Sequence, residues 1–254
     1  MVCEFKVVIP ARYGSSRLQG KPLIKIANKA MVLHVCDRAR EAGAEQIVVA
    51  TDDARILQVV KNYGFEAVMT SDAHESGTER LAEVADIYKW NKEAIIVNLQ
   101  GDEPLIPAEY IALAANSLAQ QKTAEIATLA AEIVHAEEVF NPHAVKVVVD
   151  KNQYALYFSR AAIPWDRDGF QALDEVSLRK NSYLRHIGMY AYRVGFLQRY
   201  VGWETSALEK VEMLEQLRIL WEGEKILVAE VDTAPEAGVD TEEDLFRVEQ
   251  RMLQ

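Results

Sequence analysis

The sequence predicts an α/β fold in which a mostly parallel central sheet is flanked by helices and joined to a smaller mixed or antiparallel region. Strand-like and helix-like segments alternate up to about residue 120. The apolar runs 47–50 and 95–97 are β-branched and nearly continuous, as in strands buried on both faces of a parallel sheet. In residues 124–193, strand-like segments follow one another with few helices between them. The first half is therefore predicted to be a Rossmann-like nucleotide-binding unit, to which the second half adds a mixed edge.

The individual elements follow from the same patterns of hydrophobic periodicity. Strands are expected at 5–10, 46–50, 65–69, 94–99, 125–133, 144–149, 153–158, 185–192 and 226–231. Helices are expected at 30–42, 53–63, 77–90, 107–120, 194–201, 207–222 and 241–253. The polar stretch 164–182 has no clear periodicity, so we expect a long exposed loop there.

Composition narrows the class of protein. Half of the 254 residues are apolar, which excludes a disordered chain, and no apolar run approaches the ~20 residues of a membrane span. The N-terminus lacks the layout of a signal peptide, and Cys3 and Cys36 are too few for a disulfide framework or a zinc site. A net charge of −11 argues against non-specific nucleic-acid binding. We expect a cytoplasmic protein without a membrane or nucleic-acid partner.

The segment 5–25 carries the strongest chemical signal. Its apolar run ends at Pro10 and gives way to a loop in which small residues and cations alternate: Ala11, Arg12, Gly14, Ser15, Ser16, Arg17, Gly20, Lys21 and Lys25. Backbone N–H groups and fixed cations of this kind bind polyphosphates. The spacing does not fit a Walker A loop, because Pro22 follows Lys21, and no G-x-G-x-x-G occurs. A plain basic surface loop is the alternative.

Two carboxylates follow predicted strands. Asp102 comes directly after the strand 94–99 and Gly101, where it should point to the same rim as the cationic loop. Asp240 precedes the last helix, although Asp240 or Thr241 could simply cap that helix, with Glu243 placed for a capping box. One or two carboxylates suit Mg²⁺ when phosphate oxygens and water complete its shell.

Three further segments offer polar side chains to a ligand. Ser76 can cap the helix that begins at Gly77, and Arg80 lies on its first turn, where a cation opposes the helix dipole and so suggests a ligand. In the strand 184–193 the side chains of His186, Gly188, Tyr190 and Tyr192 share one face. Glu215 and Gln216 lie on the helix 207–222. The plain interpretations are a half-buried strand and a surface amphipathic helix.

The motifs PARYGSSRLQGKPL, SGTER, NLQGDEP, LYFSR, RHIGMYAYR, LEKVEMLEQLR and GVDTEEDL resemble those of the 3-deoxy-manno-octulosonate (Kdo) cytidylyltransferase family and occur in its order. The usual prolines are replaced by Gln19, Ala237 and Glu242. The resemblance implies a nucleotidyltransferase fold in a single domain 1–254, with a nucleotide-binding half at about 1–123 and a sugar-binding and dimerisation half at about 124–254. It also implies a homodimer.

The resemblance further implies transfer of CMP from CTP to Kdo, for lipopolysaccharide biosynthesis, with Mg²⁺ on Asp102 and Asp240. Arg12 and Lys21 would join these two as catalytic residues. The nucleotide-binding set would be Ala11, Arg12, Gly14, Ser15, Arg17, Lys21, Ser76, Gly77, Arg80 and Gln100. The sugar-binding set would be Gln100, Arg160, His186, Tyr190, Glu215 and Gln216. A sialic-acid or 8-amino-Kdo cytidylyltransferase, a non-catalytic nucleotide-binding regulator and an interaction scaffold are the alternatives.

Overall fold

The predicted α/β sheet is present in the computed structural model, which describes residues 3–14, 18–74, 76–171, 178 and 183–253. Within these ranges the main sheet has nine strands in the order β11-β7-β10-β6-β1-β4-β5, with β8 paired to β10 and β9 paired to β8. The strands are β1 (Lys6–Ala11), β4 (Gln46–Thr51), β5 (Glu66–Met69), β6 (Ile95–Asn98), β7 (Ile126–Glu132), β8 (Lys146–Val149), β9 (Ala155–Ser159), β10 (Leu184–Arg193) and β11 (Ile226–Val231). Seven of the nine described strands of the main sheet point in one direction, so the sheet is mostly parallel. Only β9 and β10 among them run antiparallel to the others.

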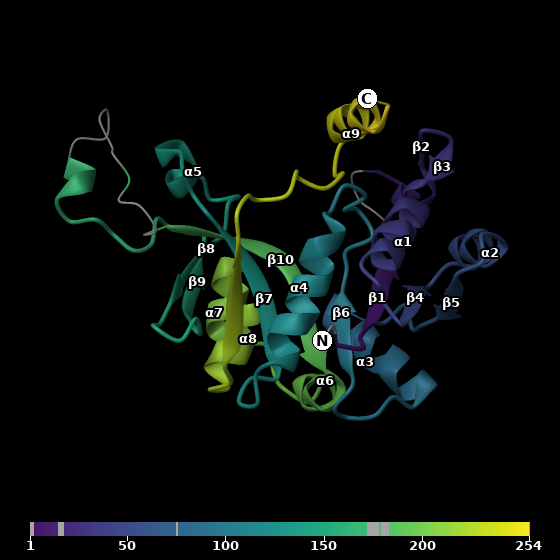
Figure 1. The fold of residues 1–254 in the computed structure, drawn as a ribbon, viewed down its shortest axis with the longest axis horizontal. Helices are drawn as coiled ribbons and strands as arrows, with labels where there is room; N and C mark the ends of the chain where they lie inside the picture. The colour runs from purple at the N-terminus through teal and green to yellow at the C-terminus, as the bar shows by residue number, and fades with distance from the viewer. Residues whose placement is uncertain (1–2, 15–17, 75, 172–177, 179–182, 254) are drawn as a thin grey trace.

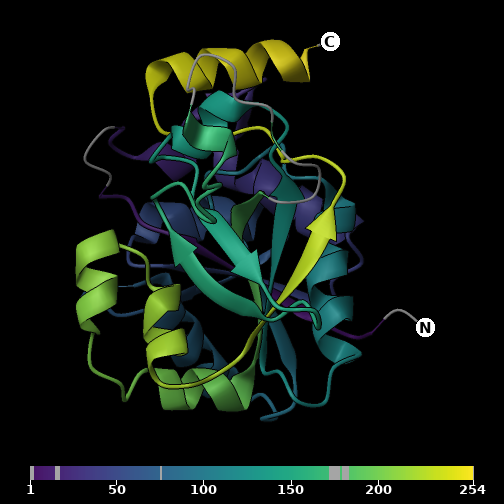
Figure 2. The ribbon, with the colours of Figure 1, turned by 90° about the vertical axis from the view of Figure 1, so that its left-hand side faces the viewer.

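Helices cover both faces of this sheet (Figures 1 and 2). They are α1 (Met31–Glu41), α2 (Ala54–Asn62), α3 (Gly77–Tyr88), α4 (Ala108–Ala119), α5 (Ala136–Phe140), α6 (Val194–Tyr200), α7 (Ala207–Glu212), α8 (Gln216–Trp221) and α9 (Glu242–Met252), with short 3₁₀ turns η1 (Lys21–Leu23) and η2 (Gly169–Gln171). In the described ranges, none of these helices has the length and apolarity that a membrane crossing requires.

The core divides into two layers because side chains of a strand alternate between its faces. In β1, Val7 and Ile9 join the cluster that includes residues of α1, α2 and α4, whereas Val8 joins the cluster with α3, α6 and α8. All three side chains have no exposed surface. The runs 47–50 and 95–97, for which burial on both faces was predicted, divide in the same way: Val49 and Val97 join the first cluster, and Val48 and Ile96 join the second. All four side chains are fully buried, so the prediction is confirmed.

The prediction of one continuous helix over 207–222 is wrong, because this segment forms two helices, α7 and α8. Met213 adopts a left-handed conformation with φ of 53°, which ends α7 and starts a turn before α8. The turn brings Leu214 into the core and places Glu215 and Gln216 at the N-terminus of α8. The amphipathic pattern runs through the break, so periodicity alone did not reveal it.

Besides the 3₁₀ turns η1 and η2, three short elements of the described residues were not predicted. The hairpin of β2 (Lys25–Ile26) and β3 (Lys29–Ala30) turns through Ala27 and Asn28, both with positive φ. Helix α9 packs over this hairpin (Figure 1). The helix α5 is the third. Of the predicted loop 164–182, residues 172–177 and 179–182 lie outside the described ranges, and η2 occupies part of the rest.

The topology brings three strand ends together. Strands β4, β1 and β6 are parallel neighbours, so their carboxyl ends meet at one edge of the sheet. The segment that leads from β11 to α9 returns to the same edge, where the backbone N–H of Val239 donates to the carbonyl of Asp102 at 2.8 Å. Residues far apart in sequence therefore share one rim, as open α/β sheets favour for ligand binding.

Candidate active site

A cavity of about 380 Å³ lies at these strand ends. We call it the nucleotide-side cavity. The residues that the sequence assigned to nucleotide binding and that the structure describes all line it: Ala11, Arg12, Gly14, Lys21, Ser76, Gly77, Arg80 and Gln100. Ser15 and Arg17 lie outside the described residues. Ser76 caps α3, since its hydroxyl accepts from the N–H of Glu79 at 3.1 Å.

Asp52 holds two guanidinium groups of this cavity. Its Oδ2 accepts from Arg12 Nε at 3.3 Å and from Arg80 Nη2 at 3.4 Å. Arg80 also donates to the hydroxyl of Thr70, and its side chain is 1% exposed. Burial lowers the pKa of Arg80, and Asp52 acts in the opposite direction. Asp52 is not among the site residues predicted from the sequence. The neighbouring Asp53 caps α2, since its Oδ1 accepts from the N–H of Arg55 at 2.8 Å.

The two predicted carboxylates meet at Lys21. Its Nζ donates to Asp102 Oδ2 at 2.7 Å, to Asp240 Oδ1 at 2.9 Å and to the carbonyl of Val239 at 2.9 Å. Burial opposes the charge on Lys21, but the carboxylates outweigh it and raise the pKa of the amine. Lys21 was expected to face the triphosphate, whereas in this structure its ammonium joins the two acidic segments.

Two glycines allow these segments to approach. A Cβ on Gly101 would lie 2.9 Å from the carbonyl oxygen of Pro10, and one on Gly238 would lie 2.8 Å from that of Asp102. The cap of α9 is Thr241, whose partner in the capping box is Asp244 and not Glu243 as expected. Because Thr241 serves as the cap, Asp240 faces Lys21 instead.

The donor set at this point fits a hard divalent cation. Asp102 and Asp240 approach one positively charged nitrogen from two sides, so a cation can be shared between them. Within the described residues no cluster of three or more acidic, His or Cys side chains could enclose a metal by itself. Two carboxylates that need phosphate oxygens to complete a shell are typical of Mg²⁺ and not of ions held by protein alone.

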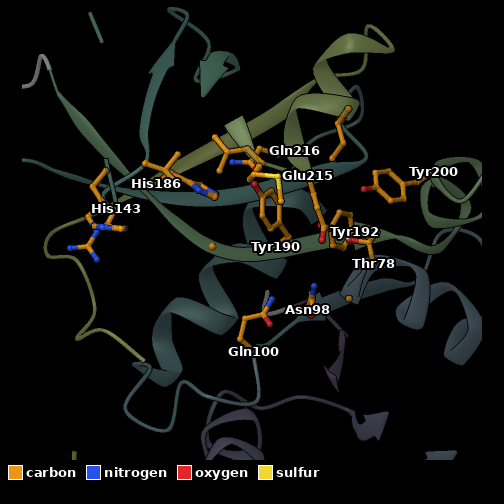
Figure 3. A pocket seen from close by; sticks show the side chains of 17 residues that line it. Thr78, Asn98, Gln100, His143, His186, Tyr190, Tyr192, Tyr200, Glu215 and Gln216 are labelled. Atoms are coloured by element: carbon orange, nitrogen blue, oxygen red, sulfur yellow. Dashed lines mark hydrogen bonds between the residues drawn. The ribbon is translucent and has the colours of Figure 1, made fainter. Parts of the chain in front are cut away.

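A second cavity, of about 430 Å³, adjoins the first, and Gly77 and Gln100 line both. We call it the sugar-side cavity. Of the residues predicted to bind sugar, Gln100, His186, Tyr190, Glu215 and Gln216 line it. In Figure 3, β10 and the α7–α8 turn supply one side, with Asn98 and Gln100 opposite.

His186 is held in a neutral form. Burial lowers its pKa to about 3. Its Nε2 lies 3.0 Å from the hydroxyl of Thr128, which in turn donates to the carbonyl of Met189 at 2.8 Å. The hydroxyl has a single proton, so we assign the ring proton to Nε2, which leaves Nδ1 as an acceptor. Thr128 also spans the irregularity between Ile187 and Tyr190 in β10.

Glu215 and Gln216 present polar atoms to the interior of the cavity. Glu215 Oε2 accepts from the hydroxyl of Thr78 at 3.3 Å, and burial raises the pKa of this carboxyl group. Gln216 Nε2 is buried without a hydrogen-bond partner among the described residues, as is Oδ1 of Asn98. Buried polar atoms are nearly always paired in native proteins, so these two indicate where a ligand binds.

Arg160 is the predicted sugar residue that does not line either cavity. Its guanidinium donates to the carbonyls of Glu212 and Pro142 at 2.7 and 3.0 Å. A different arginine, Arg185, lines the sugar-side cavity while paired with Glu138 at 2.9 Å.

Sequence reasoning also missed Asn98, Thr78 and Tyr200, which line the sugar-side cavity. An amide at the end of the buried strand β6 was a signal for Asn98. Thr78 lies two residues after the predicted cap, Ser76, and could have been included with it. Nothing in the sequence distinguished Tyr200 from a core residue of its helix.

Comparisons with known proteins identify the family of this chain. The sequence model of the cytidylyltransferase family matches residues 6–226. The chain belongs to this family. Two curated relatives are each named 3-deoxy-manno-octulosonate cytidylyltransferase. The one from Idiomarina loihiensis is 56% identical over 244 residues, covering 96% of each chain. The one from Photobacterium profundum is 58% identical over 245 residues, covering 96% of this chain and 98% of its own.

Solved structures agree with the fold. A CMP:2-keto-3-deoxy-manno-octonic acid synthetase complexed with CTP superimposes with a TM-score of 0.89 at 43% identity, covering 99% of both chains. A cytidylyltransferase from Leptospira borgpetersenii superimposes with a TM-score of 0.60 at 18% identity, covering 97% of this chain and 85% of its own. The second likeness bears on the fold alone.

Proposed function

We propose that this cytidylyltransferase transfers CMP from CTP to the anomeric hydroxyl of Kdo and releases pyrophosphate, as a step toward lipopolysaccharide. The hydroxyl oxygen forms a bond to the α-phosphorus, the bond to the bridging oxygen breaks, and the hydroxyl proton is lost. The names of the relatives and of the CTP complex support both substrates.

The proposal rests on the observation that the two cavities adjoin each other. Gly77 and Gln100 line both, and Asp102 lines the nucleotide side close to the junction of the two cavities. A triphosphate in one cavity and a polyol acid in the other would meet there. Holding two reactants in line in this way supplies much of the rate enhancement in phosphoryl-type transfers.

The chain's own residues supply most of the charge balance. Arg12 and Arg80, held by Asp52, would face the phosphates of CTP, and N–H groups at the start of α3 are available to the nucleotide. Asp102 and Asp240 are the residues that would hold Mg²⁺. When bound, Mg²⁺ would neutralise phosphate oxygens and promote ionisation of the attacking hydroxyl. Lys21 would keep the two carboxylates together between turnovers.

One experiment separates this proposal from a non-catalytic role. Pyrophosphate release should require CTP, Kdo and Mg²⁺ together, and a panel of sugar acids including sialic acid should place Kdo or a close analogue first. Asp102→Asn should lose most turnover and weaken Mg²⁺ binding in a calorimetric titration while the thermal midpoint stays near that of the wild type. Turnover by Asp102→Asn at the wild-type rate would refute the assigned metal role.

The 8-amino analogue of Kdo is a second candidate acceptor, because the carboxyl group of Glu215 lines the sugar-side cavity. Its carboxyl group has a raised pKa, as expected for an acid short of compensating charge. A substrate ammonium would supply that charge, whereas a hydroxyl would supply a hydrogen bond alone. The ratio of kcat/KM for the two acceptors decides between them.

We also infer a homodimer that works in the cytoplasm, where CTP is made. Three large apolar side chains support an interface near β7, β9 and η2: Val134, Leu156 and Trp165 are 68%, 61% and 64% exposed. Sedimentation velocity should give twice the mass of one chain, and Trp165→Glu should shift it toward the monomer. A wild-type monomer at micromolar concentration would refute the dimer.

A further inference from the structure

Tyr200, the last residue of α6, has no part in the chemistry described so far. Its side chain is 1% exposed and lines the sugar-side cavity. Its hydroxyl is buried and has no hydrogen-bond partner among the described residues. A buried hydroxyl without a partner disfavours the folded state, so its retention here points to a partner that arrives with the ligand.

The ring of Tyr200 is fixed by its neighbours. It contacts Phe196 and Trp203, with ring centroids 6.0 and 5.8 Å away, and the guanidinium of Arg218 lies 4.7 Å from its centre. Arg218 is itself held by two hydrogen bonds to Glu209, at 2.7 and 2.8 Å. The hydroxyl is therefore presented in one position, with little conformational freedom to lose when a ligand binds.

The phenol points inward toward Glu215 and Thr78 (Figure 3). Burial, and then the negative charge of Glu215, raise the pKa of Tyr200, so the hydroxyl keeps its proton at ordinary pH. A ligand group between the two side chains must accept from the phenol and donate to the carboxyl group. An alcohol hydroxyl does both with one oxygen atom.

We propose that Tyr200 and Glu215 together bind one hydroxyl group of the acceptor's polyol part, and that Tyr200 makes the enzyme select acceptors that carry a hydroxyl at that position. This inference rests on the proposed function. A site built to hydrogen-bond a substrate hydroxyl rejects an analogue without it, because buried protein groups are then left unpaired.

Tyr200→Phe is the direct test. The free protein should keep its thermal midpoint or gain slightly, because the substitution removes an unpaired hydroxyl and no hydrogen bond. The KM for Kdo should rise about 2- to 12-fold, the range of one neutral hydrogen bond, with KM for CTP unchanged. Tyr63→Phe is the matched control, since its ring is 45% exposed and lies outside both cavities.

The second part of the test compares the wild type and Tyr200→Phe on Kdo analogues that each lack one hydroxyl group. The wild type should discriminate against one analogue, and Tyr200→Phe should lose that discrimination for the same analogue only. Equal KM values for Kdo in wild type and variant, or a fall in the thermal midpoint that shows a structural hydrogen bond, would overturn the inference alone. Absence of wild-type turnover with every sugar acid would overturn the proposed function and this inference with it.

Discussion

Replacing Gly238 by alanine should separate the two carboxylates. The new Cβ would lie 2.8 Å from the carbonyl oxygen of Asp102 and 3.4 Å from Cγ of Glu103. Ordinary contacts begin near 3.4 Å, so the segment before α9 must move away by about 0.6 Å. That shift stretches the hydrogen bond from Val239 to Asp102, now 2.8 Å, and carries Asp240 away from Lys21.

The magnitude follows from two effects. Overpacking and the strained hydrogen bond should lower the free energy of unfolding by about 1–3 kcal/mol. A misplacement of 1 Å can cost on the order of 10²-fold in rate, so about 0.6 Å should lower kcat roughly 10-fold. KM for the sugar acid should change little, because Gly238 does not line the sugar-side cavity.

Pyrophosphate release at saturating substrates measures kcat, and urea unfolding measures the stability of the same preparation. Gly195→Ala is the control, since its Cβ would meet Lys92 at 3.4 Å, an ordinary contact remote from the site. Wild-type kcat in Gly238→Ala would refute the idea that the two segments must stay in contact for turnover. A similar loss in Gly195→Ala would show a general effect of the added methyl group.

Three more predictions concern the sugar-side cavity. A Cβ on Gly188 would meet no atom within 4 Å, so Gly188→Ala should fold normally yet narrow the cavity and raise KM for the acceptor about 10-fold or more, with CTP binding unchanged by calorimetry. Thr128→Val should lower the free energy of unfolding by about 1–3 kcal/mol in urea, because the carbonyl of Met189 loses its donor and His186 Nε2 loses its acceptor, and Thr128→Ser should restore most of it. Burial raises the pKa of Glu215 above its ordinary 4.5, so kcat/KM for the acceptor should fall in acid with a midpoint above 4.5, and Glu215→Gln should remove that dependence. A midpoint at or below 4.5 would contradict this use of the carboxylate.

The nucleotide side could be predicted from sequence because its parts are local. Strand β1 is a continuous apolar run, and the cations follow it within one loop. Asp102 and Asp240 are far apart in sequence, yet both follow strands of a parallel sheet, and carboxyl ends of such strands share an edge. The pairing with Lys21 was not foreseen, because the three-way contact depends on the close approach at Gly238.

The sugar side was predicted less completely because its geometry is non-local. Met213 in a left-handed conformation breaks a helix that the apolar pattern continues, and no glycine or proline marks the position. Arg160 is engaged by carbonyls of segments distant in sequence. The unpaired hydroxyl of Tyr200 can be recognised only once the cavity around it is known.

The two cavities differ in electrostatic character, and this bears on how the attacking hydroxyl loses its proton. The nucleotide side combines arginine and lysine with carboxylates, whereas His186 on the sugar side is neutral with a pKa of about 3. An imidazole with so low a pKa is a weak base, and the proton on Nε2 is committed to Thr128. We therefore infer that His186 orients the acceptor through Nδ1 and does not remove the proton. In the proposed function, Asp102 and Asp240, which both line the nucleotide-side cavity, would hold the cation whose positive charge would promote ionisation of the hydroxyl.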